Sequence, residues 1–355
     1  MDLAIIKIFI PALMAFAIGI IIAPVLVHFL YKHRVWKKQG GKIALNGQVA
    51  TEFNRLKGEG ETKTPRMGGV VIWLSVFITV GFLWLAAQLF THPGWDHLSF
   101  LSRSQTWIPL ATLMIGALIG FLNDFYDVTT HDGQGIRLRI RLLLITLLSA
   151  SIAWWFLTRL DVSSVNIPLL GPWELGWFII PFFILLTLAV YASGVIDGID
   201  GLSGGVFAAI FTAYVGVAFI QQQYDIAAFS ATMAGAILAF LWFNIPPARF
   251  YMTETGTMAL TLTLAVLAFM TDTLGDGYGI SVLPIIAAPL VATVVSNIIQ
   301  LFYRKLTGQK FFRIAPLHHH FEAIGWPSYK VTMRYWVITM MTGMLGIVIV
   351  ALLTI

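Results

Sequence analysis

Six of the 17 acidic residues and three of the eight histidines occur in four short motifs that are separated by long apolar stretches. The motif GFLNDFYDV carries Asp124 and Asp127, and SGVIDGIDGLSGG carries Asp197 and Asp200. Glu254 lies in FNIPPARFYMTETGT, and the motif APLHHHFE carries His318, His319, His320 and Glu322. Charged groups beside hydrocarbon are costly to desolvate, so they are commonly functional. These four motifs are therefore the first candidates for a site.

The DGIDG segment combines two carboxylates with flexible backbone. Asp197 and Asp200 are three residues apart and fall on one side of a helical turn. The glycines at 198 and 201 let the backbone bend and approach a ligand closely. Mg²⁺ prefers a few carboxylates together with water and substrate phosphates, so the segment fits a magnesium site. It fits equally well an aspartate cap of the following helix beside a glycine turn.

The other motifs also have a structural and a functional interpretation. Asp124 fits a polar helix end wetted by interfacial water or a functional carboxylate, and Glu254 fits a surface carboxylate in a short loop or a metal ligand. Tyr251 fits an interfacial anchor or a platform on which a base stacks. Three consecutive histidines cannot all point one way on a helix, which argues against a zinc site. A hydrogen-bonding role toward phosphates fits them better, because several Lys and Arg residues are near.

The elements that carry these motifs are predicted to be membrane-spanning helices. Of the 355 residues, 58% are hydrophobic and 11% are charged, whereas a soluble protein is about a quarter charged. This composition excludes a soluble enzyme, a disordered protein and a nucleic-acid binder, and the absence of Cys excludes disulfides and thiolate sites. A helix needs roughly 20 mostly apolar residues to cross a bilayer. Ten apolar runs that approach this length lie at Ala4–Leu30, Gly68–Phe90, Trp107–Leu122, Leu138–Leu157, Leu175–Tyr191, Gly201–Ile220, Ala227–Phe243, Thr257–Met270, Ile280–Tyr303 and Thr332–Ile355. We therefore expect an all-α integral membrane protein with about ten transmembrane helices.

The basic residues predict how these helices are oriented. Nineteen of the 22 Lys and Arg residues lie in the odd-numbered loops between the predicted spans, nine of them in the first loop. Because an excess of Lys and Arg marks the cytoplasmic side, the odd loops are expected in the cytoplasm and both termini on the extracytoplasmic side. The four polar motifs all fall at odd loops. We expect residues 1–355 to form a single polytopic membrane domain with its active site on the cytoplasmic face.

Several motifs resemble those of a known family. APLHHHFEAIGWP, preceded by TGQKFFRI, resembles a signature of the phospho-N-acetylmuramoyl-pentapeptide-transferase family. DGIDGL, the FN-x-x-PA segment and TP-x-MGG resemble other segments of that family in the same order. The wider superfamily of polyprenyl-phosphate N-acetylhexosamine-1-phosphate transferases shares most of these segments, whereas PLHHHFE-x-x-GWP is typical of the muramoyl branch. The resemblance extends from about Thr64 to Trp336.

The resemblance implies a Mg²⁺-dependent phosphoglycosyl transferase of the bacterial cytoplasmic (inner) membrane that acts in peptidoglycan synthesis. Such an enzyme transfers phospho-N-acetylmuramoyl-pentapeptide from UDP-N-acetylmuramoyl-pentapeptide to undecaprenyl phosphate, giving lipid I and UMP. By the same resemblance, the catalytic residues are Asp124, Asp197 and Asp200, and the metal ligands are Asp197, Glu254 and Asp124. The positions that match the family's substrate-binding residues are Gly198, Ile199, Asn244, Tyr251, His318, His319 and His320. The expected partners are the two substrates and membrane lipids, with no nucleic acid. Dimers are common in the family, so the resemblance also allows a homodimer.

The chain departs from the family pattern at several of these positions. The aspartate pair at the end of the third span is Asn123–Asp124, and the Lys expected three residues later is Asp127. The metal-site Asp of MGD-x-GS is Glu254 within MTETGT, and TP-x-MGG has Arg66 where Thr is usual. Asp127 resembles the N-acetylglucosamine-phosphate branch, so a transferase that uses UDP-N-acetylglucosamine is the alternative enzyme. The alternatives outside catalysis are a silent relative that binds prenyl lipids and a transporter.

Overall fold

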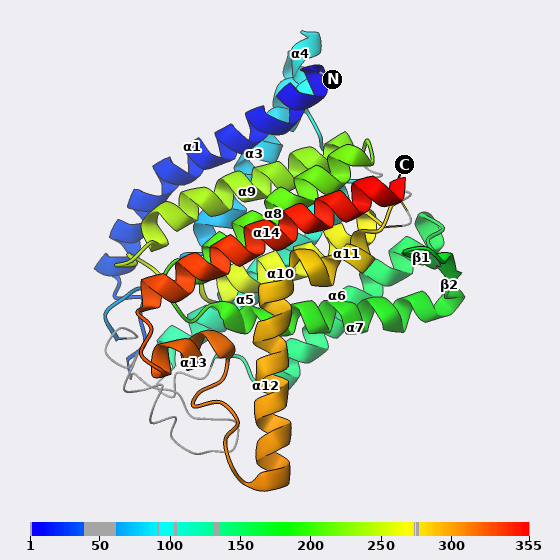
Figure 1. Cartoon of the computed structure of the whole chain (residues 1–355). Helices are drawn as coiled ribbons and strands as arrows, with labels where there is room; N and C mark the ends of the chain where they lie inside the picture. Colours follow the sequence, from blue (N-terminus) through cyan, green and yellow to red (C-terminus); the bar gives the residue numbers. More distant parts are fainter. Residues whose placement is uncertain are drawn as a thin grey trace.

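The long elements of the structure are apolar helices. The structure is a computed structural model, and it describes residues 2–38, 62–90, 92–102, 105–130, 135–272, 274 and 277–354. Within these ranges nine helices are long and apolar enough to cross a membrane, and a bent helix pair makes up to ten spans. Eight of the nine are α1 (Asp2–Lys32), α3 (Val70–Leu89), α5 (Trp107–Thr129), α6 (Leu138–Arg159), α8 (Leu202–Ile220), α9 (Tyr224–Asn244), α10 (Thr253–Met270) and α14 (Ser328–Thr354) (Figure 1). The ninth, Gly176–Ile196, consists of α7 (Ile179–Ala192) with the short helices η2 (Gly176–Phe178) and η3 (Ser193–Ile196) at its ends. The prediction of an all-α protein with about ten membrane spans is confirmed.

Helix α10 forms the centre of the bundle (Figure 1). Nearly all of its residues are buried, and it packs against α5, α7 and α3. Two of its threonines are tolerated in this apolar surrounding because their hydroxyls bond to the helix itself: Thr257 Oγ1 donates to the Thr253 carbonyl at 3.2 Å and Thr261 Oγ1 to the Thr257 carbonyl at 2.7 Å. The outer helices α1 and α14 instead expose apolar side chains such as Leu13 and Met344. Such exposure suits a lipid environment, since lipid tails are as apolar as these side chains.

The ninth predicted span is broken in the middle. Helices α11 (Gly279–Ile286) and α12 (Ala288–Thr307) meet at an angle of 73°. Pro284 lies inside α11 and Pro289 in the first turn of α12. Proline lacks the backbone N–H that an uninterrupted helix needs, which explains the break. The run Ile280–Tyr303, expected as one span, is therefore two helices, and α12 leaves the bundle at a steep angle to α14 (Figure 1).

The connection between α6 and α7 contains a hairpin that the apolar pattern does not predict. Strand β1 (Ser164–Ile167) pairs antiparallel with β2 (Gly171–Glu174). Asn166 fastens the hairpin to the carboxyl end of α10, because its backbone N–H donates to Asp272 Oδ1 at 2.8 Å and its Nδ2 donates to the Gly277 carbonyl at 2.8 Å. This hairpin lies at the opposite end of α10 from Glu254.

The amino-terminal end of α1 and the carboxyl end of α14 lie at one end of the bundle (Figure 1), and the predicted site residues lie at the other. The Arg66 N–H donates to the Val35 carbonyl at 2.8 Å, so the segment before α3 lies just beyond the carboxyl end of α1. The Thr332 hydroxyl, in the first turns of α14, donates to the Asp200 carbonyl at 3.2 Å. The sides of the membrane on which these ends lie stay a prediction. Lys42, Arg55 and Lys57, which supported that orientation, lie outside the described residues.

Candidate functional site

Thr253, the first residue of α10, joins two predicted site carboxylates that are far apart in the sequence. Oδ2 of Asp124, near the end of α5, accepts hydrogen bonds from Thr253 Oγ1 (2.5 Å), Thr255 N (2.7 Å) and Thr255 Oγ1 (2.6 Å). Oδ2 of Asp197, which follows the short helix η3 (Ser193–Ile196), accepts from the Thr253 N–H at 2.9 Å. Since both aspartates contact one residue, their carboxylates are neighbours. The structure thus brings Asp124 and Asp197 together.

Thr253 holds this position in a strained backbone conformation. Its φ is +55°, in the left-handed region that a β-branched residue rarely adopts. It occupies the position of the glycine in the MGD-x-GS pattern, and glycine adopts this conformation without steric cost. Such strain costs on the order of 1–3 kcal/mol and persists only where surrounding contacts fix it. The bonds to both aspartates, with a third from the Met67 N–H to Thr253 Oγ1 at 3.2 Å, are such contacts.

Two arginines that the sequence analysis did not assign to the site pair with its acidic residues. Arg66 Nη2 lies 3.0 Å from Asp127 Oδ2 and 3.8 Å from Asp124 Oδ1. Arg141, in the first turns of α6, forms an ion pair and hydrogen bond with Glu254. The sequence signal for Arg66 is its place directly before the MGG turn, whereas nothing in the sequence distinguishes Arg141 from Arg137 and Arg139 beside it.

The donor set fits a Mg²⁺ ion with two protein carboxylates. Asp124 and Asp197 are neighbours, and among the described residues Oδ1 of Asp124 makes long contacts, to Asn123 Nδ2 at 3.4 Å and to Arg66 Nη2 at 3.8 Å. Mg²⁺ commonly takes one or two carboxylates and completes its coordination with water and substrate phosphates. In the described part of the chain no group of three His, Asp or Glu is arranged to hold a metal. Glu254 pairs with Arg141 instead, and its assignment as a metal ligand stays a prediction.

The DGIDG segment lies directly against the histidine motif. Helix α13 (Leu317–Ala323) buries His318 and His319 completely or nearly so. A Cβ placed on Gly198 would lie 2.5 Å from His319 Nε2 and 2.8 Å from His318 Nε2, so only glycine allows this approach. His319 Nδ1 is 2.7 Å from Glu322 Oε2, which fixes the ring and directs Nε2 toward the glycine.

The third histidine points elsewhere. The Arg313 N–H donates to His320 Nδ1 at 3.3 Å, and the ring packs edge-on against Phe312 with centroids 5.3 Å apart. Burial and the nearby Arg313 charge lower the pKa of His320 below its usual value. Its ring is therefore neutral near pH 7, with the proton on Nε2, and it offers one hydrogen-bond donor instead of a positive charge.

The remaining predicted substrate-binding residues surround the same segment. Asn244, at the end of α9, accepts from the Gly201 N–H at 2.9 Å and donates to the Phe250 carbonyl at 2.8 Å, so its amide fixes two loops. Asp200 Oδ2 accepts from the Ala248 N–H at 3.1 Å, and Ile199 is buried. A cavity of about 490 Å³ opens beside Asp200 and is lined also by Pro246, Pro247, Ser328 and Tyr329.

Tyr251 connects the segment before α3 with the start of α10. Its N–H donates to the Pro65 carbonyl at 2.8 Å, and its carbonyl accepts from the Gly68 N–H at 2.8 Å. The side chain is half-buried. The backbone of Tyr251 therefore holds Arg66 and Thr253 in place, while its ring is partly accessible.

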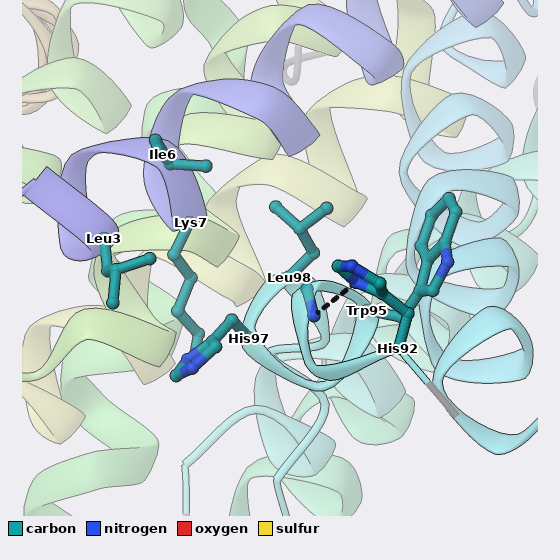
Figure 2. Close-up of a pocket in the computed structure, with 8 residues that line it drawn as sticks. Leu3, Ile6, Lys7, His92, Trp95, His97 and Leu98 are labelled. Atoms are coloured by element: carbon teal, nitrogen blue, oxygen red, sulfur yellow. Dashed lines mark hydrogen bonds between the residues drawn. The ribbon is translucent and has the colours of Figure 1, made fainter. Parts of the chain in front are cut away.

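A second cavity, of about 440 Å³, lies between the amino-terminal end of α1 and the short helix α4 (Pro93–Leu98). Figure 2 shows Leu3, Ile6 and Lys7 of α1 facing His92, Trp95, His97 and Leu98 across it. The predicted site residues lie at the other end of α1, and none of them lines this cavity.

Comparison with known proteins gives a consistent set of relatives. Residues 106–272 match the family described as Glycosyl transferase family 4. The chain is 32% identical over 339 residues to a phospho-N-acetylmuramoyl-pentapeptide-transferase of Anoxybacillus flavithermus, covering 95% of each chain. It is 30% identical over 342 residues to the protein of the same name from Bacillus subtilis, covering 95% of this chain and 96% of the relative. The chain is 29% identical over 340 residues to the protein of the same name from Acetivibrio thermocellus, covering 94% of this chain and 92% of the relative.

Proposed function

Because the chain belongs to the phospho-N-acetylmuramoyl-pentapeptide-transferase family, we propose that it transfers phospho-N-acetylmuramoyl-pentapeptide from its UDP-linked donor to undecaprenyl phosphate. The products are lipid I, a peptidoglycan precursor, and UMP. The chain is a multi-pass protein of the bacterial inner membrane. The observation that carries the proposal is the bridge that Thr253 makes between Asp124 and Asp197, because it joins the two aspartate motifs at one end of the membrane helices.

The reaction exchanges one phosphorus–oxygen bond for another. An oxygen of undecaprenyl phosphate attacks the donor phosphorus that carries the sugar, and the bond from that phosphorus to the UMP oxygen breaks. Phosphoryl transfer depends mostly on in-line positioning and on neutralising charge. A phosphate monoester loses its second proton at a pKa of about 6, so the acceptor is already mostly a dianion near pH 7. We therefore assign Asp124 to orienting the acceptor phosphate more than to deprotonating it.

Asp124 and Asp197 are the residues that would hold Mg²⁺. A bound Mg²⁺ supplies positive charge to the diphosphate oxygens and so helps UMP to leave. Asp197 Oδ1 accepts from Ser203 Oγ at 2.7 Å, and its Oδ2 accepts from Thr253, so the carboxylate is held in one orientation. Arg141 compensates the charge of Glu254 at the edge of this acidic group.

The donor is proposed to bind along the DGIDG segment. Asp200, Gly198 and Ile199 match the uridine-binding positions of the family. Asn244 holds the segment through Gly201, and the ring of Tyr251 would stack on the base. His318 and His319 pack against Gly198 and would hold the sugar diphosphate. His320 matches the same motif and would add one neutral donor.

The identity of the donor sugar has one competing candidate. Asp127, where the muramoyl branch has Lys, favours UDP-N-acetylglucosamine as the donor. The motif PLHHHFE-x-x-GWP favours the muramoyl donor, and we propose that donor because the relatives named above carry that activity in their names. The cytoplasmic location of the site and a homodimeric assembly stay part of the proposal.

The deciding experiment measures UMP release by the purified full chain in detergent with undecaprenyl phosphate. Parallel reactions contain UDP-N-acetylmuramoyl-pentapeptide or UDP-N-acetylglucosamine, each with Mg²⁺, with EDTA, and with Mg²⁺ restored after EDTA. We expect release with the muramoyl donor alone, loss of that release in EDTA, and recovery on adding Mg²⁺. Release only with the glucosamine donor would assign the chain to the other branch. No release with either donor from folded protein would favour a silent relative.

Replacing Tyr251 by Ala is expected to raise the KM for the UDP-linked donor by about 10-fold, with little change in kcat. Loss of an aromatic ring stacked on a base costs about 1–3 kcal/mol of binding. The hydrogen bonds of Tyr251 to Pro65 and Gly68 use its backbone and are kept in the variant. Tyr251→Phe, which keeps the ring, is the matched control and should retain the original KM. An unchanged KM in Tyr251→Ala would mean that the ring is an interfacial anchor.

A further inference from the structure

Arg66 is a cation placed against two buried carboxylates of the proposed site. Its Nη2 lies 3.0 Å from Asp127 Oδ2 and 3.8 Å from Asp124 Oδ1. The side chain of Arg66 is 17% exposed, whereas those of Asp124 and Asp127 are 0% and 7% exposed. Water screens such a group only weakly, so the arginine charge acts strongly on whatever binds beside Asp124.

The backbone around Arg66 is fixed before any ligand binds. The Arg66 N–H donates to the Val35 carbonyl at 2.8 Å, and the Pro65 carbonyl accepts from the Tyr251 N–H at 2.8 Å. The next residue, Met67, has φ +68° and donates its N–H to Thr253 Oγ1. This segment is therefore tied to the same threonine that joins Asp124 and Asp197. A cation fixed in this way loses little conformational entropy when it binds an anion.

The guanidinium also retains a hydrogen-bond donor for a ligand. Within the described residues, Arg66 Nε is buried and has no hydrogen-bond partner. A buried donor without an acceptor costs about 1–3 kcal/mol, and arginine presents its donors in a planar fork that matches phosphate oxygens. An anionic oxygen beside Arg66 would remove this cost. The dianionic acceptor phosphate and the donor diphosphate both supply such oxygens.

The identities of Arg66 and Asp127 are linked by their contact. The family pattern has Thr and Lys at these two positions, and this chain has Arg and Asp. The cation has thus moved across a direct contact, and a carboxylate that pairs with it now occupies the position it left. We propose that Arg66 binds a phosphate oxygen of a substrate and supplies from the segment before α3 the charge that the pattern places at position 127. This inference rests on the proposed function and deepens it.

The test compares four variants of the full chain in detergent. Arg66→Thr is expected to raise the KM of the substrate it contacts by about 10- to 100-fold, the effect of losing a charge-assisted hydrogen bond. Arg66→Lys, which keeps the charge, should raise the same KM by less than about 10-fold. Arg66→Thr with Asp127→Lys restores a cation from the other side of the contact and should return the KM to within about 3-fold of the original value.

The fourth variant separates phosphate binding from a structural role. Arg66→Thr with Asp127→Asn removes the cation and also the carboxylate that the cation neutralises. If Arg66 only neutralised Asp127, this variant would regain the original KM, and the proposal would be overturned. The proposal expects its KM to stay as high as that of Arg66→Thr. Arg139→Thr, the same substitution at an exposed arginine of α6, is the control and should change nothing.

Varying the two substrates separately identifies the phosphate that Arg66 binds. A raised KM for undecaprenyl phosphate alone assigns the acceptor phosphate, and a raised KM for the UDP-linked donor alone assigns the diphosphate. Unchanged values for both substrates in Arg66→Thr would overturn the proposal. Equilibrium binding of each substrate, compared between the original chain and the variants, gives the same comparison without turnover. It therefore remains decisive if the proposed transferase activity itself is not found.

Discussion

Replacing Asp124 by Asn is expected to lower kcat/KM for UMP release by about 100-fold or more while the bundle stays assembled. The Asp124 side chain is completely buried, and its Oδ2 accepts three hydrogen bonds from Thr253 and Thr255. An asparagine carbonyl can still accept these bonds, so the start of α10 keeps its partners. The oxygen that faces Arg66 becomes an amide nitrogen, however, and an amide nitrogen can neither bind Mg²⁺ nor attract a guanidinium. The acceptor phosphate would then lose its orientation.

Asp124→Ala tests how much the same residue contributes to the stability of the fold. It leaves the donors of Thr253 and Thr255 buried without an acceptor, and each such group costs about 1–3 kcal/mol. We therefore expect Asp124→Ala to lower the thermal unfolding midpoint clearly and Asp124→Asn to lower it little, with initial rates of UMP release measured on the same samples. Asp225→Asn is the control, because Asp225 pairs with Lys7 at the other end of the bundle. An Asp124→Asn variant within about 3-fold of the original rate would remove Asp124 from the mechanism.

Replacing Gly198 by Ala is expected to reduce kcat/KM by about 100-fold, because it pushes the DGIDG segment away from α13. The added Cβ would lie 2.5 Å from His319 Nε2 and 2.8 Å from His318 Nε2. Neither ring can move aside easily, since both are buried and His319 is bonded to Glu322. Overpacking of this kind costs about 1–3 kcal/mol, so the unfolding midpoint should also fall.

Two further variants separate the steric effect of Gly198→Ala from lost chemistry. Gly81→Ala places the same methyl group in α3, where no described atom beyond the local helix backbone lies within 4 Å of the added Cβ, and it should leave rate and stability unchanged. Gly198→Ala combined with His319→Ala removes the nearer of the two clashes, while the one with His318 stays, so it should recover only part of the unfolding midpoint and none of the rate. A Gly198→Ala variant that keeps the original rate and the original unfolding midpoint would show that activity does not need contact between the histidine motif and the DGIDG segment.

The membrane helices are the part of the fold that the sequence predicts best. A long apolar run has a single stable conformation in a bilayer, because the helix satisfies every backbone polar group within the run. The runs therefore match the observed helices closely. The helices at the third and eighth runs are longer than the runs predict, since α5 extends to Thr129 and α10 begins at Thr253. These extra turns carry the polar site residues, so hydropathy alone ends both helices too early.

The break at Ala287 and the β1–β2 hairpin are harder to predict from the sequence. Pro284 and Pro289 signal an interruption, but the 73° angle depends on how α11 packs against α14 and α8. The hairpin is fixed by Asn166 and Asp272, which are more than a hundred residues apart. Hydropathy averages over neighbouring residues, so it carries no information about such a pair.

By itself, the sequence determined that this protein is a helical membrane protein and which motifs carry its polar chemistry, because hydrophobic runs and motif spacing are local properties of the chain. Only the tertiary structure decided which charges meet. It joined Asp124 to Asp197 through Thr253, placed Arg66 on Asp127, and paired Arg141 with Glu254. Electrostatic and hydrogen-bond energies depend on distance and burial, and both are set by helices that are remote in sequence. The departures at positions 66 and 127 therefore become intelligible as a pair only when their side chains are seen in contact.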